Sequence, residues 1–234
     1  RAAELGCTGT QFINANGLDG IGQKTMTTAR DLALISCELL KHPKILDYTG
    51  IWMDTVRGGK FGLANTNKML KSYQGLTGLK TGYISEAGFC ISASAERDGL
   101  SIVAVVMAAP TKEDRMADAT ALLNSGFANF AVYTPPADVL RPVPVKLGKT
   151  DTVQPAMESS SLVIEKAKAA ELETTLDLPE TLTAPVEQGQ TIGELTVSSG
   201  GETVLRVPLT AAEAVEAKGI GSLFLDFWGG MLGG

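Results

Sequence analysis

The chain has 234 residues, of which 44% are hydrophobic and 20% charged, so it can bury a sizeable core in one large or two smaller domains. Its net charge of −6 and the lack of any cluster of five or more Lys and Arg argue against a nucleic-acid partner. Three cysteines and one histidine stand at no metal-ligand spacing, so we expect no metal and no cofactor, and predict free thiols at Cys7, Cys37 and Cys90.

The first predicted helix follows Thr28, because Thr28 and Asp31 form a capping-box pattern. Four apolar residues then recur on one helical face: Leu32, Ile35, Leu39 and Leu40. His42-Pro43 ends this helix, and we interpret His42 as a charge near the helix C-terminus rather than as a catalytic base. A short strand is expected at residues 55–57, before the Gly58-Gly59 turn.

The pattern from Lys80 onward predicts a meander of strands. Residues 88–95 alternate in polarity, Asp98-Gly99 predicts a hairpin turn, and residues 100–107 are almost continuously apolar. Such a run is typical of a central strand that is covered on both faces.

A second capping box, Thr111 to Asp114, predicts another helix. Met116, Ala119 and Leu123 form its apolar stripe, and Gly126 is expected to end it. A sheet with packing helices predicts an α/β or α+β core.

The character of the chain changes at residues 133–136, Tyr-Thr-Pro-Pro. Short β-rich runs follow, separated by Gly, Pro and Ser: residues 143–146, 162–165, 173–176, 191–197 and 202–207. Gly200-Gly201 predicts a hairpin between the last two. We therefore expect a small β-rich domain over residues 131–215. No chemistry is visible in it, and it serves either as a spacer or docking platform or only as a stabilising appendage.

A third segment is expected over residues 216–234. Its apolar residues recur at the spacing of one helical face: Ile220, Leu223, Phe224, Phe227, Trp228 and Met231. Such a face can lie in a membrane interface, with Trp228 at headgroup depth. Gly229-Gly230 should weaken the helix, and no Lys or Arg follows Gly219. Peripheral membrane attachment, packing on the β-rich domain and an oligomer contact all stay open.

The stretch from Gly78 to Tyr83, Gly-Leu-Lys-Thr-Gly-Tyr, carries the clearest chemistry of the chain. A strand at the rim of a pocket can pair with an extended peptide. Lys80 supplies a positive charge, the Thr81 hydroxyl can bond a carboxylate, and Gly82 lets a substrate backbone come close. The Lys-Thr-Gly triplet alone is weak evidence, but its neighbours strengthen it.

Those neighbours stand in a fixed order around the triplet: Thr10-Gln-Phe-Ile-Asn14, Asn16-Gly-Leu-Asp19, residues 63–70, Glu86-Ala-Gly-Phe-Cys90, Ser92-Ala-Ser-Ala95, Arg97-Asp-Gly99, and Ala109-Pro-Thr111 followed by Arg115. The series resembles the D-alanyl-D-alanine carboxypeptidases, the low-molecular-weight penicillin-binding proteins that trim peptidoglycan stem peptides. The resemblance implies part of an α/β (α+β) penicillin-binding, β-lactamase-like transpeptidase domain over residues 1–130. It also implies the β-rich second domain and an amphipathic C-terminal anchor.

The same resemblance assigns roles to individual residues. Lys80 would keep the proton-relay region electropositive, Thr81 would bond the terminal carboxylate of the substrate, and Gly82 would complete the catalytic triplet. The backbone N–H of Tyr83 would supply one donor of the oxyanion hole. Arg115 would assist with the carboxylate, for which a guanidinium fork is suited.

Polar residues beside the pocket receive a lesser role. Asn65 and Asn67 are expected to orient the pocket loop through backbone hydrogen bonds. Asn14 and Asp19 are interpreted in the same way.

Two motifs of the family are absent. The chain contains no Ser-x-x-Lys and no Ser-x-Asn, and the nearest match, Thr77-Gly-Leu-Lys80, uses the strand lysine. We therefore expect a C-terminal fragment that is inactive alone and needs an N-terminal complement carrying the nucleophile. Its expected partners are stem peptides and β-lactams, on the outer face of the bacterial cytoplasmic membrane.

Two other functions stay open. A β-lactamase shares the Lys-Thr-Gly chemistry, but the Asn-Thr-Asn segment at residues 65–67 and the appended β domain favour a carboxypeptidase. A membrane-peripheral wall-binding or scaffold protein without catalysis is the other alternative. A Ser-x-x-Lys and a Ser-x-Asn encoded before Arg1 would favour the enzyme.

Overall fold

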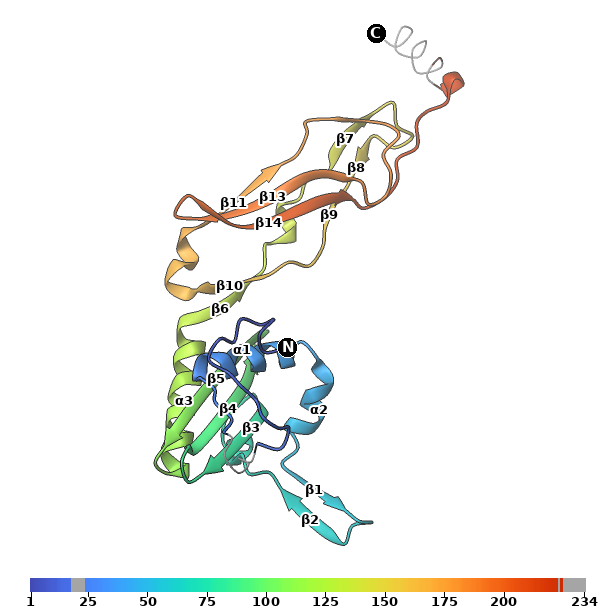
Figure 1. The fold of residues 1–234 in the computed structure, drawn as a ribbon. Coiled ribbons are helices and arrows are strands. Elements are labelled where there is room, and N and C mark those ends of the chain that lie inside the picture. Colours follow the sequence, from blue (N-terminus) through green and yellow to red (C-terminus); the bar gives the residue numbers. More distant parts are fainter. Residues whose placement is uncertain (18–23, 223, 225–234) are drawn as a thin grey trace. The chain divides into compact units, whose positions relative to one another are not determined.

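The computed structural model describes residues 1–17, 24–222 and 224. The chain divides into two compact units, unit 1 (Arg1–Ala131) and unit 2 (Val132–Gly234), which are described separately (Figure 1). Unit 1 contains these elements in chain order: α1 (Ala29–Leu40), η1 (Pro43–Ile45), α2 (Leu46–Thr49), β1 (Met53–Val56), β2 (Phe61–Ala64), η2 (Lys68–Lys71), β3 (Leu76–Ile84), β4 (Gly88–Arg97), β5 (Leu100–Ala109) and α3 (Lys112–Asn129).

The main sheet of unit 1 is antiparallel, with the order β3-β4-β5. The turn at Asp98-Gly99 joins β4 and β5 as predicted, and both of its residues have positive φ, 51° and 75°. The prediction that residues 100–107 form a strand covered on both faces is confirmed, because β5 contacts both α1 and α3. Its predicted central position was wrong for the described residues, where β5 is an edge strand.

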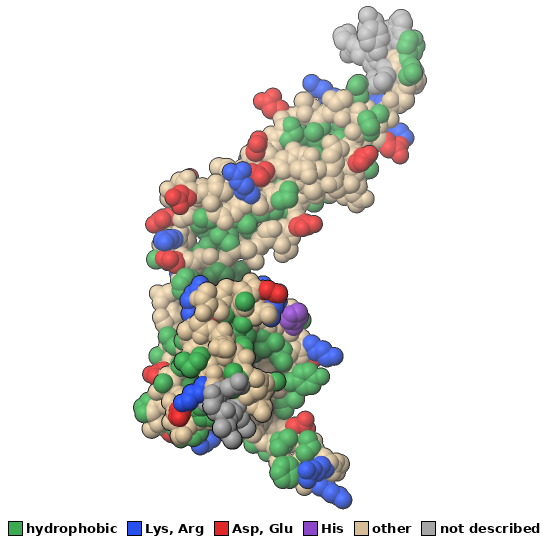
Figure 2. Space-filling model, viewed as in Figure 1, with side chains coloured by type: hydrophobic (Ala, Val, Ile, Leu, Met, Phe, Trp, Pro, Cys, Tyr) green, Lys and Arg blue, Asp and Glu red, His purple; other side chains and the backbone are tan. Residues whose placement is uncertain are grey.

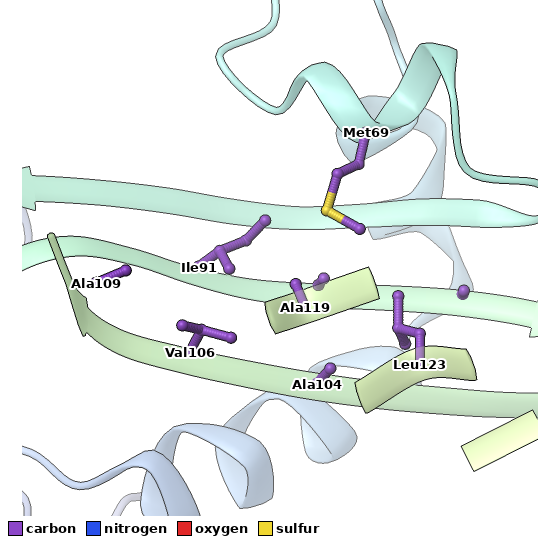
Figure 3. Packing of buried hydrophobic residues seen from close by; sticks show 9 residues of the cluster. Met69, Ile91, Ala104, Val106, Ala109, Ala119 and Leu123 are labelled. Atoms are coloured by element: carbon purple, nitrogen blue, oxygen red, sulfur yellow. The ribbon is translucent and has the colours of Figure 1, made fainter. Parts of the chain in front are cut away.

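The two helices pack on opposite faces of this sheet. Ser36 of α1 hydrogen-bonds to Ser92 at 2.7 Å, whereas α3 packs against Ile91, the residue before Ser92 in β4, which points to the other face. On the α3 face, Ile91 and Val106 of the sheet meet Ala119 and Leu123 of α3, and Met69 of η2 closes the cluster (Figure 3).

The N-cap threonines of both predicted capping boxes are confirmed. The Thr28 side chain accepts a hydrogen bond from the Asp31 amide at the start of α1, and Thr111 accepts one from the Asp114 amide at the start of α3. The predicted stripe of α1 is only half-buried and Leu39 is exposed, whereas the buried residues of α1 are polar, Asp31 and Ser36.

Gly126 does not end α3, so that prediction was wrong. The helix continues to Asn129, and a Cβ at Gly126 would lie 2.6 Å from Cδ1 of Ile102 on β5. This glycine therefore permits close packing of helix on strand rather than a helix cap.

The predicted strand at residues 55–57 is part of a hairpin, β1–β2, whose two strands pair with each other and with no other strand in the described part of the chain. All eight strand residues are exposed, among them Met53, Phe61 and Leu63. Figure 2 shows hydrophobic and basic side chains side by side on this hairpin, and the Arg57 guanidinium lies over the Phe61 ring.

Unit 2 is β-rich. Its elements are β6 (Phe130–Tyr133, which begins in unit 1), η3 (Ala137–Val139), β7 (Val143–Lys146), β8 (Thr152–Val153), β9 (Pro155–Met157), β10 (Leu162–Glu165), η4 (Lys166–Glu171), β11 (Leu172–Asp177), β12 (Leu182–Thr183), β13 (Thr191–Ser199) and β14 (Glu202–Ala211). A four-stranded sheet has the order β11-β13-β14-β9 and a three-stranded sheet the order β12-β7-β8. The hairpin at Gly200-Gly201 joins β13 and β14 as predicted. A mixed α/β unit followed by a β-rich unit confirms the predicted fold class.

The predicted amphipathic segment falls largely beyond the described residues. Leu223, Phe227, Trp228 and Met231 lie outside them, as does Asp19 near the N-terminus. None of the helices in the described part of the chain is long and apolar enough to cross a membrane.

Candidate active site

Strand β3 carries the Lys-Thr-Gly triplet at the edge of the main sheet. Within residues 1–17 and 24–222, β4 is the strand that pairs with it, so its other edge is free for an extended ligand. Successive side chains of a strand point to opposite faces, so Lys80 and Gly82 lie on the α1 face and Thr81 and Tyr83 on the α3 face. The triplet thus presents its charge and its hydroxyl on opposite sides of one edge.

On the α1 face, Lys80 stands opposite Ser92 of β4. The Lys80 side chain is solvent-exposed, and its Nζ donates to the carbonyl of Thr81. Ser92 and Ser36 are hydrogen-bonded to each other behind it. An exposed ammonium beside two hydroxyls makes this side of the strand both positive and polar.

On the α3 face, Thr81 is buried, with 7% of its surface exposed. Its Oγ1 lies 2.6 Å from Oγ1 of Thr66, which is exposed. Sequence reasoning missed Thr66, because the two threonines are 15 residues apart and neither motif nor periodicity connects them.

The two asparagines that flank Thr66 hold its segment against β3. Asn67 is 2% exposed, accepts from the Met69 amide at 3.2 Å and donates to the Gly78 carbonyl at 3.4 Å. Asn65 accepts from the Asn67 amide at 2.9 Å and donates to the Ile51 carbonyl at 3.0 Å. The predicted role of both asparagines, to orient a loop through backbone hydrogen bonds, is confirmed.

Gly82 has a different reason to be glycine than its neighbour Gly78. A Cβ at Gly78 would lie 2.6 Å from Thr49, so the chain's own packing forbids a side chain there. A Cβ at Gly82 would meet only Cys90, at 4.0 Å, which is ordinary contact. Because internal packing leaves room at Gly82, its small size favours the close approach of something outside the described chain.

Tyr83 and Phe89 face each other across β3 and β4, with ring centroids 4.3 Å apart in a stacked arrangement. The Tyr83 side chain is 58% exposed. Packing on Phe89 therefore restrains the last residue of the motif, and with it the backbone N–H that the resemblance assigns to the oxyanion hole.

Arg115 lies in the first turn of α3 and is 95% buried, with 5% of its surface exposed. It donates to the Cys90 carbonyl at 3.3 Å, and its guanidinium lies 5.9 Å from the centre of the Phe89 ring. Its Nε has no hydrogen-bond partner among the described residues. Burial is the largest effect on the pKa of Arg115 and lowers it, whereas Cys90 and Glu113 act in the opposite direction.

The structure therefore groups the predicted site residues around β3. Thr81, Tyr83 and Arg115 share the α3 face, and Arg115 reaches β4 at Cys90, the residue opposite Gly82. Lys80 lies on the other face. No group of His, Cys, Asp and Glu within the described residues could hold a metal ion, and the three cysteines are free thiols. Asn14 accepts from the Gly17 amide in a local turn, at 2.9 Å.

The arrangement can bind an extended chain that ends in a carboxylate. The free edge of β3 offers backbone hydrogen bonds, the Thr81 hydroxyl and the Lys80 ammonium offer donors, and Gly82 leaves space. Groups of this kind can bind and stabilise an anion, whereas no serine of the chain stands in a Ser-x-x-Lys motif.

Comparison with known proteins places the two units in known families. Residues 1–111 match the family model of D-alanyl-D-alanine carboxypeptidases, and residues 134–217 match that of the C-terminal domain of penicillin-binding protein 5. D-alanyl-D-alanine carboxypeptidase DacF of Bacillus subtilis is 32% identical over 226 residues, which cover 94% of this chain and 58% of that relative. The chain thus spans little more than half the length of this curated relative.

Solved structures show the same likeness. Penicillin-binding protein 5 from Haemophilus influenzae superposes with a TM-score of 0.60 at 27% identity, covering 92% of this chain and 63% of that one. Penicillin-binding protein D2 from Listeria monocytogenes, in its cefotaxime-bound form, is 41% identical with a TM-score of 0.51, over 54% of this chain and 51% of that one.

Proposed function

Because this chain belongs to the D-alanyl-D-alanine carboxypeptidases, the low-molecular-weight penicillin-binding proteins, we propose that it forms the Lys-Thr-Gly wall of a peptidoglycan carboxypeptidase active site. The enzyme removes the terminal D-alanine of stem peptides through a serine acyl-enzyme and is acylated by β-lactams. The observation that carries the proposal is the free edge of β3, with Lys80 and Thr81 on its two sides and an unfilled space at Gly82.

The chemistry divides between this chain and a nucleophile outside these 234 residues. The serine attacks the carbonyl of the penultimate D-alanine, the terminal D-alanine leaves, and water then hydrolyses the ester. The Tyr83 N–H donates to the oxyanion that forms in each step. Thr81 donates to the carboxylate of the leaving D-alanine, and Arg115 and Lys80 supply positive charge around it.

The partly paired state of Arg115 supports its assignment. A buried guanidinium with an unpartnered Nε lowers the stability of the fold unless a ligand provides the missing hydrogen-bond acceptor. Packing alone would not require an arginine at this position. A substrate carboxylate on the α3 face of β3 would lower that cost by adding an anion close to the cation. The gain would appear as binding energy for ligands with a free carboxylate.

The carboxypeptidase is favoured over a β-lactamase by unit 2. Residues 134–217 match the C-terminal domain of penicillin-binding protein 5, which a stand-alone β-lactamase does not need. A scaffold protein without catalysis would have no use for an open Gly82 between a lysine and a restrained Tyr83.

We further propose that the protein acts outside the cytoplasm, on the outer face of the bacterial membrane, where stem peptides are exposed. Peripheral attachment through the C-terminal apolar segment belongs to the same proposal, and most of that segment lies outside the described residues. No nucleic-acid partner is expected for a chain with a net charge of −6.

The test uses the full-length protein that contains this chain, treated with fluorescent penicillin and examined by intact-mass spectrometry and peptide mapping. We expect one equivalent of penicillin on a serine of a Ser-x-x-Lys motif outside these 234 residues, followed by slow release. Rapid turnover of penicillin would indicate a β-lactamase. No labelling, together with no release of D-alanine from a D-Ala-D-Ala peptide, would overturn the proposal.

A further inference from the structure

The hydroxyl groups of Thr66 and Thr81 are hydrogen-bonded to each other. Their Oγ1 atoms are 2.6 Å apart, the length of a well-formed O–H···O bond. Each hydroxyl has one proton, and their mutual bond uses one of the two. The pair therefore keeps a single O–H to offer to a third group.

A bound carboxylate would determine which of the two threonines is the donor in their mutual hydrogen bond. An ionised carboxylate only accepts hydrogen bonds, so the remaining O–H must point at it. If Thr81 donates to the carboxylate, its oxygen must accept the proton of Thr66. The O–H of Thr66 then polarises that of Thr81, which strengthens the bond to the anion.

Hydrogen bonds of the two neighbouring asparagines restrain the segment that carries Thr66. Asn65 and Asn67, on either side, are bonded to backbone groups, and Asn67 ties the segment to the Gly78 carbonyl of β3 itself. Thr66 is solvent-exposed although its neighbour Asn67 and its partner Thr81 are both buried. An exposed threonine contributes little to a core, so a purely structural role would not require its hydroxyl.

We propose that Thr66 is a positioning residue for carboxylate recognition: it donates to Thr81 and holds the Thr81 hydroxyl as a donor to the terminal carboxylate of the substrate or β-lactam. The inference rests on the proposed function, in which Thr81 contacts that carboxylate. It adds a residue that acts through Thr81 and does not itself touch the ligand.

The experiment compares acylation of the full-length protein by benzylpenicillin and by its methyl ester, in which the carboxylate is masked. The measured quantity is the ratio of the two second-order rate constants, acid over ester. Removing the donor with Thr66→Val should lower this ratio about fivefold, the effect expected for one neutral hydrogen bond. Thr66→Ser keeps the hydroxyl and should leave the ratio within about twofold of wild type.

Two further variants complete the test. Thr81→Val should lower the ratio more than Thr66→Val does, and the double variant should equal Thr81→Val alone, because Thr66 acts only through Thr81. Thr174→Val, which removes a hydroxyl paired with Tyr133 in unit 2, is the matched control and should leave the ratio unchanged. The thermal midpoint of each variant shows that it is folded.

The outcomes distinguish failure of the Thr66 role from failure of the Thr81 role. An unchanged ratio in Thr66→Val, or losses that multiply in the double variant, would overturn the positioning role while Thr81 keeps its own. A ratio that does not change in Thr81→Val would show that Thr81 is not the carboxylate contact, which overturns both the proposed role of Thr81 and this inference.

Discussion

The two units of the chain bury different kinds of side chain. Among the described residues, the buried polar and charged side chains all lie in unit 1: Asp31, Ser36, Asn67, Thr81, Ser94 and Arg115. Unit 2 buries valine, leucine, isoleucine and alanine, in two clusters around Val153 and Leu195. Burying a polar group costs free energy unless it is paired. Five of these six side chains are hydrogen-bonded throughout, and only Arg115 keeps a buried atom, its Nε, without a partner among the described residues, so the core of unit 1 depends on specific hydrogen bonds in a way that the core of unit 2 does not.

The two units also differ in where their buried polar side chains lie. In unit 1, Asn67 and Ser94 bond to β3 and Thr81 lies in it, whereas the described residues of unit 2 contain no buried polar side chain of this kind. We therefore expect polar burial in unit 1 to matter for ligand binding and apolar burial in unit 2 to matter for stability. Variants in each unit should separate these two properties.

The largest expected effect is on the stability of unit 2. Leu195 is fully buried in the cluster with Val197, Val207 and Leu209, so Leu195→Ala should lower the free energy of unfolding by about 2–5 kcal/mol. Hydrogen exchange read from peptides of unit 2 measures the loss. The rate of acylation by penicillin should stay at the wild-type value at temperatures where the variant is folded.

Val204→Ala is the matched control, because Val204 is 44% exposed on β14 of the same sheet. It should change the free energy of unfolding by less than about 0.5 kcal/mol. A slower acylation in the Leu195 variant while both units remain protected would contradict the division of roles.

The opposite pattern is expected for Lys80. Its side chain is exposed and bonds only locally, so Lys80→Ala should change the stability of unit 1 by less than about 0.5 kcal/mol. Acylation of the full-length protein should fall about 100-fold, the order lost with one preorganised group that stabilises a developing anion. Stopped-flow or gel-based labelling with fluorescent penicillin measures the rate.

The control for Lys80 is Lys146→Ala, an exposed lysine of strand β7 in unit 2. It removes the same charge from the chain and should leave acylation unchanged. Equal losses in the two variants would show that overall charge, and not the position of Lys80, governs the reaction.

Local sequence signals predicted much of the fold. The hairpins at Asp98-Gly99 and Gly200-Gly201 and both helix caps involve residues within a few positions of one another, and the predicted boundaries of β7 and β10 match the structure. Such features depend on the backbone preferences of the residues at the turn or cap itself. One of the two predicted hairpins lies in each unit.

The site was predicted only in part, because its decisive contacts are not local. The Thr66–Thr81 bond joins segments 15 residues apart, and the burial of Arg115 depends on the packing of α3 against β4. Gly126 shows the same limit, since its contact with Ile102 decides its role rather than helix propensity. The sequence predicted the strand that carries Lys80 and Thr81, but not which helix covers each of its faces.

Arg115 should show that binding and stability oppose each other. Arg115→Met keeps most of the side-chain volume and removes a buried charge with an unpartnered Nε, so the free energy of unfolding should stay within about 1 kcal/mol of wild type or rise. Acylation by benzylpenicillin should fall about tenfold, as expected for the loss of a charged contact to the carboxylate. Urea unfolding and labelling rates measure the two effects on the same protein.

The control is Arg206→Met in unit 2, where the arginine is exposed and pairs with Glu194 at 3.1 Å. An exposed ion pair contributes little, so neither stability nor acylation should change measurably. If Arg115→Met instead destabilises unit 1 by several kcal/mol, the arginine is a structural element and its assignment to the carboxylate fails.

The smallest effect concerns Asp31, which ties the N-terminal segment to α1. Its carboxylate accepts from the Thr10 hydroxyl at 2.7 Å and from the Gly9 amide at 2.9 Å. The hydrogen bond from Thr10 is the largest cause that holds the pKa of Asp31 below its usual value, and burial opposes it. The folded state therefore favours the ionised form, and this contribution to stability is present above the unfolded pKa of about 3.9 and is lost as the pH falls through the folded value.

Thr10→Val removes that main donor, so the variant should be less stable than wild type near pH 7. The difference in stability between variant and wild type should shrink as the pH falls below about 4, because protonated Asp31 forms a weaker hydrogen bond with the Thr10 hydroxyl.

Pulse-labelling hydrogen exchange at peptides of α1 along urea titrations gives the unfolding midpoints at each pH. Thr49→Val, which removes a hydroxyl of unit 1 that donates to the Thr77 carbonyl at 2.8 Å, is the control and should cost the same at every pH. A pH-independent loss in Thr10→Val as well would show that the polar contacts of Asp31 serve packing alone, and would weaken the contrast between the units at this position.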